Sequence, residues 1–154
     1  EDLGIITDDV TRLRRACGFP GMRVMQFAFG DNARNPYLPH NFGRCTVAYT
    51  GTHDNNTTVG WWANASENER QAARQYLGPV TDSEIHWAMI QSLSQSVANT
   101  LVVPFQDVLG LDGQHRMNTP GQPEGCWSWR FAWADVGDEP ARRLSSMVRA
   151  HGRA

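Results

Sequence analysis

The sequence predicts an α/β fold built on a parallel β-sheet, as in part of a (β/α)8 barrel. Strand-like apolar runs alternate with helical runs along the 154 residues, and that alternation favours parallel strands joined by right-handed crossovers. Three or four such strands are too few to close a barrel alone. In addition, an acidic residue lies within two positions of three of the four predicted strand ends. Active sites of such barrels lie where the strands end, so a site is expected at that edge.

The first half of the chain supplies a strand end, one helix and two strands. Residues 1–6 (EDLGII) are typical of the end of a strand, and a short amphipathic helix is expected between Thr7, as its N-cap, and Gly18. Residues 23–30 (RVMQFAFG) alternate bulky and small or polar side chains, which predicts a strand packed against helices. After a loop rich in Pro, Asn and Gly, residues 45–52 (CTVAYTGT) predict a second strand. The apolar helix face is Val10, Leu13 and Cys17, and the bulky strand face is Met25, Phe27 and Phe29.

Helices dominate the middle of the chain. Ser66 and Glu69 have the spacing of a capping box, and so do Thr81 and Glu84. Apolar residues recur every four positions in the second of these helices. They are Ile85, Met89, Leu93 and Val97.

The last third contains one more strand, a long loop and a final helix. Residues 100–105 (TLVVPF) predict the strand, and roughly one helical turn follows at 105–111. Residues 110–135 predict an irregular segment, and loops of that length usually have a function. The final helix is expected to begin near Asp138 and Pro140. Its inner face would be Ala141, Leu144, Val148 and His151.

Composition excludes several classes of partner and site. The chain is 40% hydrophobic and 19% charged, which is typical of a globular domain, and its net charge of −2 gives no reason to expect nucleic acid or a membrane as partner. No signal sequence or membrane-spanning run is evident. An odd number of cysteines without C-x-x-C spacing favours a reducing, cytoplasmic location over a disulfide framework or a zinc site. The cysteines are Cys17, Cys45 and Cys126.

His53 and Asp54, in the segment TGTHDNNTT, are the main candidate site residues. One interpretation is structural: Asp54 would form an Asx turn and cap a helix that begins near Thr57. A calcium loop is disfavoured, because the position that requires Gly is occupied by Val59. The functional interpretation pairs Asp54 with Glu1 at two strand ends, since glycoside chemistry needs one carboxyl to donate a proton and others to stabilise positive charge.

Other motifs narrow the choice of chemistry. Tryptophans are usually core or interface residues, although some could stack on sugar rings. The chain contains no Cys-His or Ser-His-Asp signature, and its glycines form no phosphate-binding or dinucleotide-binding loop. Phosphoryl transfer and nicotinamide chemistry are therefore disfavoured. The tryptophans in question are Trp61, Trp62, Trp127, Trp129 and Trp133.

Six segments together resemble the 4-alpha-glucanotransferases of the amylomaltase, or disproportionating enzyme, family. They stand in the same order as in that family and cover almost the whole chain, least clearly between residues 64 and 96. The segments are EDLGIIT, GFPGMRVMQFAF, NPYLPHNF, YTGTHDNNTT, VPFQDVLGL and RMNTPGQPEGCWSWRF. The resemblance implies that residues 1–154 form the C-terminal part of a catalytic (β/α)8 barrel. This part would run from the end of strand five through strand eight and the final helix, and would be an incomplete domain.

The resemblance also implies roles for individual residues. Glu1 matches the general acid/base, and Asp54 matches the carboxylate that stabilises the transition state. His53 matches a substrate-binding histidine, while Asp31 and Asn118 match positions that contact sugar hydroxyls. The nucleophilic aspartate of the family belongs to an earlier strand and has no counterpart in this chain.

The implied activity is retaining transfer of α-1,4-glucan segments to an acceptor glucan or glucose, without metal or cofactor. The expected partners are an α-1,4-glucan or maltooligosaccharide and the missing N-terminal half of the barrel. Two alternatives stay open: a glucan hydrolase of the same clan, and a non-catalytic glucan-binding fragment. The chain alone is expected to be inactive, because a covalent retaining route needs the nucleophile.

Overall fold

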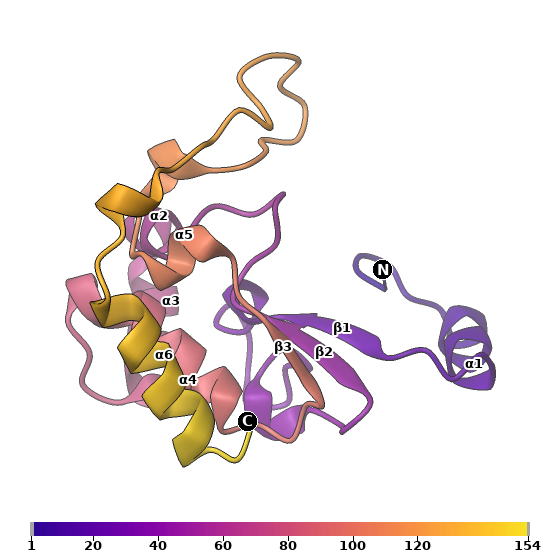
Figure 1. The fold of residues 1–154 in the computed structure, drawn as a ribbon. Coiled ribbons are helices and arrows are strands. Elements are labelled where there is room, and N and C mark those ends of the chain that lie inside the picture. The colour runs from indigo at the N-terminus through magenta and orange to yellow at the C-terminus, as the bar shows by residue number, and fades with distance from the viewer. Residues whose placement is uncertain (1, 154) are drawn as a thin grey trace.

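The computed structural model describes residues 2–153 and shows an α/β fold around one parallel sheet (Figure 1). The sheet contains β1 (Gly21–Val24), β2 (Thr46–Tyr49) and β3 (Thr100–Val102), in the spatial order β1-β2-β3. Both pairs of neighbouring strands are parallel, with Gly21 opposite Thr46 and Val47 opposite Thr100. The prediction of a parallel α/β fold is therefore confirmed.

Helices occupy most of the connections between and after the strands. Within residues 2–153, the α-helices are α1 (Asp8–Ala16), α2 (Thr58–Asn64), α3 (Glu67–Leu77), α4 (Ile85–Ser94), α5 (Phe105–Val108) and α6 (Glu139–Ala150). Short 3-10 turns lie at Met25–Phe27, Pro39–Asn41, Asp82–Glu84, Gly113–His115 and Trp133–Asp135. In this described part of the chain, no helix has both the length and the apolar character needed to cross a membrane.

One face of the sheet is covered by helices. Figure 1 shows α2 to α6 gathered on one side of the strands. Ala48 of β2 is fully buried there, and Leu101 of β3 packs against the same cluster. Burial of each large apolar side chain contributes roughly 1.5–3 kcal/mol, so this cluster holds the helices to the sheet. Its buried members include Met25, Phe29, Trp62, Ala73, Ile85, Met89 and Leu93.

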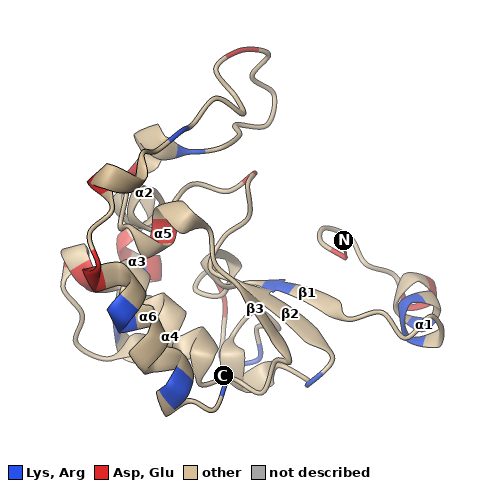
Figure 2. Ribbon diagram, in the orientation of Figure 1, with Lys and Arg blue, Asp and Glu red and all other residues tan. Residues whose placement is uncertain are grey.

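The opposite face of the sheet is only partly covered by residues 2–153, which bury Val24 on it. Met22, Val47 and Tyr49 are half-buried on this face, and Val102 is 43% exposed. Strands β2 and β3 carry no charged residue, and the charges lie on the helices, the loops and β1 (Figure 2). Parallel sheets are normally covered on both faces. This face of the sheet is therefore largely apolar and only partly covered by the described residues.

Helix α1 has the predicted N-cap but does not bury its apolar face. The amide of Val10 donates to the Thr7 hydroxyl at 3.5 Å, as expected for an N-cap. Val10 is 42% exposed and Leu13 is 67% exposed, because α1 lies apart from the other helices (Figure 1). The helix was predictable from its sequence, but its apolar face stays exposed among the described residues.

The strand predicted at residues 23–30 is wrong in extent and in pattern. β1 ends at Val24, and a 3-10 turn replaces the strand from Met25 onward. Gln26, expected on the small or polar face away from the helices, is buried and donates its amide to the carbonyl of Asn56 at 2.8 Å. Phe27, expected on the packed face, is 43% exposed. The tertiary hydrogen bond of Gln26, together with burial on both sides of the turn, outweighs the local preference for a strand that the alternating side chains indicated.

Only one of the two predicted capping boxes forms. Ser66 and Glu69 make both reciprocal hydrogen bonds at the start of α3. Thr81 makes no capping hydrogen bond, and the carboxylate of Glu84 instead accepts a hydrogen bond from Arg143 of α6. The second capping box does not form because the Glu84 carboxylate that it requires is engaged in an ion pair with Arg143.

Helix α4 ends earlier than its apolar repeat predicts. Its predicted inner residues Ile85, Met89 and Leu93 are fully buried, but the helix ends at Ser94 and Val97 is 50% exposed. The guanidinium of Arg153 binds the carbonyls at this end, which satisfies groups that a helix C-terminus leaves unpaired. The accepting carbonyls are those of Leu93, Ser94, Ser96 and Ala98, at 2.7–3.4 Å.

The segment after β3 largely follows the prediction. A single turn of helix, α5, comes first, and residues 110–135 contain two short 3-10 turns but no α-helix or strand. Helix α6 begins at Glu139, next to the predicted Pro140. Leu144 of α6 packs against a second apolar cluster with Trp87 and Ile90 of α4.

Acid is expected to destabilise the fold through His86. Burial lowers the pKa of this imidazole, while the carboxylates of Glu84 and Asp107 oppose the shift. A histidine with a lowered folded-state pKa takes up its proton more readily when unfolded. Its stabilising contribution is complete above the unfolded pKa of about 6.5 and is lost as the pH falls from there through the folded-state pKa.

Urea unfolding at pH 7.5 and 5.5 measures this effect. The midpoint of the natural chain should fall more than that of His86→Gln, whose side chain cannot be protonated. His151→Gln is the matched control and should keep the natural pH dependence. Equal losses in the natural chain and His86→Gln would contradict the assignment.

Candidate active site

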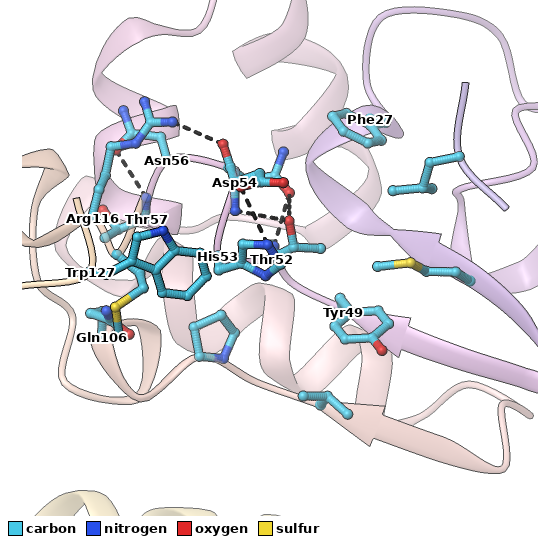
Figure 3. Close-up of a pocket in the computed structure, with 17 residues that line it drawn as sticks. Phe27, Tyr49, Thr52, His53, Asp54, Asn56, Thr57, Gln106, Arg116 and Trp127 are labelled. Carbon is cyan, nitrogen blue, oxygen red and sulfur yellow. Dashed lines mark hydrogen bonds and ion pairs between the residues drawn. The ribbon is translucent and has the colours of Figure 1, made fainter. Parts of the chain in front are cut away.

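A cavity of about 530 Å³ lies at the ends of the three strands (Figure 3). This is the edge at which a site was expected, and the volume is in the range that holds a small organic ligand. The loop after β2, residues 51–57, forms one wall and is called the Asp54 loop below. Other lining residues include Phe27 after β1, Pro104 and Gln106 after β3, and Arg116, Met117 and Trp127 from the long loop.

Local hydrogen bonds shape the Asp54 loop. The side-chain oxygen of Asn55 accepts from both the amide and the hydroxyl of Thr52, at 2.9 and 2.8 Å. The Thr52 hydroxyl in turn accepts from the amide of Asp54 at 3.2 Å. Asn and Thr favour such turns, because their short polar side chains bind nearby backbone groups. The turn holds the backbone of Asp54 while its carboxylate stays free to point elsewhere.

The structural interpretation of Asp54 is wrong. Helix α2 begins at Thr58, and its cap is the hydroxyl of Thr57, which accepts from the amide of Gly60 at 3.0 Å. The carboxylate of Asp54 therefore does not cap the helix. Thr57 takes that role because it stands immediately before the first helical residue, where an N-cap hydroxyl reaches the first turn.

Asp54 of the cavity wall is contacted by Asn118, which directly follows the cavity-lining residue Met117. The amide of Asn118 donates to the Asp54 carboxylate at 2.5 Å, and Nε2 of His53 lies 3.3 Å from the same oxygen. The guanidinium of Arg116 donates to the backbone carbonyl of Asp54 at 2.9 Å (Figure 3). The Asp54 side chain remains 47% exposed. The carboxylate is thus oriented by protein groups and still accessible to a ligand.

Trp127 adds an aromatic surface beside His53. Their ring centroids are 5.1 Å apart, and Trp127 is 56% exposed. Its φ of +62° lies in the left-handed region, which is uncommon for a bulky residue and is found where surrounding structure holds the backbone in place. The amide of Trp127 donates to the carbonyl of Met117 at 2.6 Å, and that bond helps to hold it there.

The other predicted tryptophans divide between core and surface. Trp62 is buried, and its indole donates to Asp82 at 2.8 Å, while Trp61 is half-buried against the main core. Trp133 is 74% exposed, and Trp129 stacks on Phe131 with centroids 5.5 Å apart. The core interpretation is confirmed for the first pair only.

One predicted site residue, Asp31, does not join Asp54, and another cannot be compared with it. Glu1 lies outside the described residues, so its pairing with Asp54 stays a prediction. Asp31 is exposed after the turn at Met25–Phe27, does not line the cavity, and accepts a hydrogen bond from its neighbour Asn32 at 2.8 Å. Asp2 binds the amide of Met22 at 2.6 Å, which attaches the N-terminal segment to β1.

The arrangement offers a carboxylate with amide and imidazole groups rather than a metal centre. Within residues 2–153, no three His, Cys, Asp or Glu side chains gather closely enough to hold a metal ion. An exposed carboxylate can stabilise a developing positive charge or accept hydrogen bonds from hydroxyl groups. Both are functions that a sugar-processing site requires.

Sequence reasoning missed Arg116 and did not connect Trp127 with His53. Arg116 stands two residues before Asn118, in a loop whose length alone suggested a function. Its contact with Asp54 joins residues 62 positions apart, and no local pattern encodes such a contact.

Comparison with known proteins identifies the family of this chain. Residues 1–135 match the sequence profile of the family described as 4-alpha-glucanotransferase. The chain belongs to the 4-alpha-glucanotransferase family. It is 46% identical over 154 residues to the 4-alpha-glucanotransferase of Synechocystis sp. and 45% identical over 161 residues to that of Thermus thermophilus, in each case over 99% of this chain. A chloroplastic/amyloplastic 4-alpha-glucanotransferase of Oryza sativa subsp. japonica is 52% identical over 131 residues, or 85% of the chain.

The matches cover only part of each 4-alpha-glucanotransferase. This chain spans 30%, 32% and 22% of the Synechocystis, Thermus and Oryza proteins, respectively. Its fold resembles the structure of the amylomaltase from Streptococcus agalactiae in complex with acarbose, with a TM-score of 0.95 and 32% identity. That comparison covers 100% of this chain and 31% of the amylomaltase chain.

Proposed function

We propose that this chain forms part of a 4-alpha-glucanotransferase that transfers α-1,4-glucan segments with retention of configuration. The observation that carries the proposal is the half-exposed Asp54 carboxylate, oriented by Asn118 and His53 in a cavity at the ends of parallel strands. Family membership agrees with it, and the related amylomaltase was solved in complex with acarbose.

Asp54 has the central role in the proposed mechanism. As the glycosidic bond breaks, positive charge develops on the sugar ring, and an ionised carboxylate held beside the ring lowers the energy of that state. Asn118 keeps Asp54 in one orientation, and His53 would contact a sugar hydroxyl. Trp127 offers the flat apolar surface on which a sugar ring can stack.

Glu1 would act as the general acid/base. It would protonate the leaving oxygen in the first step and take the proton from the acceptor hydroxyl in the second. Leu3, two positions later, lines the same cavity as Asp54, which supports placing Glu1 in this site. Asp31 would contact a more distant sugar hydroxyl, since it does not line the cavity.

The remaining part of the site would come from a further part of a (β/α)8 barrel. We propose that residues 1–154 are the C-terminal part of this barrel, from the end of strand five to the final helix. The partly covered apolar face of the sheet and the exposed apolar face of α1 support a missing partner layer. The nucleophile, which in a retaining mechanism lies only about 5–5.5 Å from the acid/base carboxyl, would belong to that part.

A cytoplasmic location stays a prediction. Its basis is that all three cysteines are free, and free cysteines are usual in a reducing compartment. The Oryza relative is described as chloroplastic/amyloplastic.

A chimera tests the function. This chain would replace the matching segment of the Thermus thermophilus 4-alpha-glucanotransferase, and the protein, called the chimera below, would be incubated with maltotriose. Glucose together with longer maltooligosaccharides is expected from the chimera and neither from the isolated chain. A chimera that melts cooperatively but releases only shorter sugars would indicate a hydrolase. Binding of maltooligosaccharide without any product would indicate a binding fragment.

A further inference from the structure

We propose that Asp107 is a positioning residue that fixes the Asp54 loop by binding the two residues that flank it. Asp107 lies in α5, and Thr50 and Thr58 stand directly before and after residues 51–57. Asp107 itself is 1% exposed and does not line the cavity.

Both oxygens of the Asp107 carboxylate are engaged. One accepts from the hydroxyls of Thr50 and Thr58 at 2.5 and 2.8 Å, and the other accepts from the amide of Thr58 at 2.7 Å. Thr50 and Thr58 are both buried. In a buried environment, hydrogen bonds to a charged group are strong, and a polar group without a partner costs free energy. The ends of the Asp54 loop are therefore held at a set separation, and the geometry of the loop follows from it.

The neighbouring Gln106 binds a second segment, the one that carries Arg116 and Asn118. Its side-chain amide donates to the carbonyl of His115 at 3.2 Å. His115 directly precedes Arg116, and Asn118 follows two residues later. Two consecutive residues of α5 thus bind the two segments that meet at the Asp54 carboxylate. This explains how groups from distant parts of the chain reach one hydrogen-bonding geometry.

Amide exchange tests the positioning role in the 154-residue chain without reference to activity. In Asp107→Ala, amides of residues 51–58 should exchange at least about tenfold faster, because local opening of the loop becomes easier. Amides of α3 should keep their natural rates. Asp107→Asn should behave like the natural chain, since its carbonyl can accept from Thr58 and its amide can donate to both hydroxyls.

Kinetics of the chimera supply the second measurement and rest on the proposed function. Asp107→Ala should lower kcat on the order of 10- to 100-fold at a temperature where the protein is folded, since small misplacements of catalytic groups have effects of that size. Asp107→Asn should keep kcat within about threefold. Arg153→Ala is the control, because it loses hydrogen bonds at the end of α4 far from the cavity and should reduce stability without changing kcat.

The outcomes separate the two proposals. An inactive parent chimera contradicts the proposed function, while the exchange rates still test Asp107. Unchanged exchange at residues 51–58 in folded Asp107→Ala contradicts positioning, and so does an unchanged kcat. If Asp107→Ala does not fold, Thr50→Val decides: faster exchange in the Asp54 loop with a lower kcat supports the proposal, and natural values of both contradict it. Loss of activity in Asp107→Asn with a well-ordered loop would also contradict a positioning role.

Discussion

Replacing Asp54 with Asn in the chimera is expected to lower the rate of glucan transfer by about 10²–10³-fold, a size typical for removal of one electrostatic stabiliser of a transition state. The variant keeps the volume of the side chain, and its carbonyl can still accept the hydrogen bond from Asn118. It loses the negative charge that opposes the positive charge developing on the sugar ring. Binding of unreacted substrate should therefore change little.

Turnover of maltotriose and calorimetric binding of a maltooligosaccharide measure the two quantities separately. Asp138→Asn is the matched control: this exposed carboxylate stands before α6, makes no capping hydrogen bond, and does not line the cavity. The control should keep both natural values. If Asp54→Asn loses affinity but keeps its turnover, Asp54 binds ground-state substrate and the proposed role is wrong.

Gly60→Ala is expected to destabilise the chain even though alanine is the better helix former. In α2, Ala would ordinarily be favoured over Gly by about 1 kcal/mol. A Cβ at this position, however, would lie 2.8 Å from the backbone Cα of Gly113 and 2.3 Å from the Asn56 side chain. Overpacking of this kind costs about 1–3 kcal/mol. The backbone of the 113–115 turn has to move, since it offers no flexible side-chain end that could yield.

The measurement is the thermal midpoint of the 154-residue chain. The overpacking cost less the helix-propensity gain leaves a net destabilisation of up to about 2 kcal/mol, which lowers the midpoint by up to about 8 °C in a domain of this size. The control is Gly43→Ala, whose new Cβ would meet no atom within 4 Å. It should melt at or slightly above the natural temperature. A higher midpoint for Gly60→Ala would show that helix propensity outweighs the close contact.

The same substitution should also disturb the site. The turn that begins at Gly113 leads directly to Arg116 and Asn118, both of which hydrogen-bond to Asp54. A displaced turn would lengthen these bonds, so the chimera with Gly60→Ala should lose part of its transfer rate as well as stability. This links the close approach of α2 and the turn to the orientation of the carboxylate.

Several elements could be predicted because their signals are local. The N-caps at Thr7 and Ser66 depend on side chains that bind backbone amides within one turn, and both appear in the structure. The periodic residues of α4 are buried as the repeat predicts. The predicted extent of β1 and the predicted capping box at Thr81 were wrong. The side chains of Gln26 and Glu84 bind partners that lie 30 and 59 positions away, and no local pattern indicates those contacts.

The candidate site was predictable in part. His53 and Asp54 stand at a strand end, and the strand-end rule made them one of four candidate positions, while their roles were implied only by the family resemblance. Asn118 was selected only through the family resemblance, and its contact with Asp54 spans 64 positions. Asp107 also stands shortly after a strand, but nothing in its neighbours in sequence indicates that it binds Thr50 and Thr58.

The sequence by itself determined the parallel α/β class, most helix positions and the placement of His53 and Asp54 after a strand. Periodicity, capping residues and turn residues act within a few positions, so each can be read locally. Only the tertiary structure decided that Thr57 caps α2, that Asn118 orients the Asp54 carboxylate, and that Asp107 binds both ends of the Asp54 loop. The N-cap of α2 could have been any of several neighbouring polar residues, and the position at which the helix begins selects Thr57. The other two join segments brought together by burial of the core, and the energy of those contacts exists only after the chain has folded.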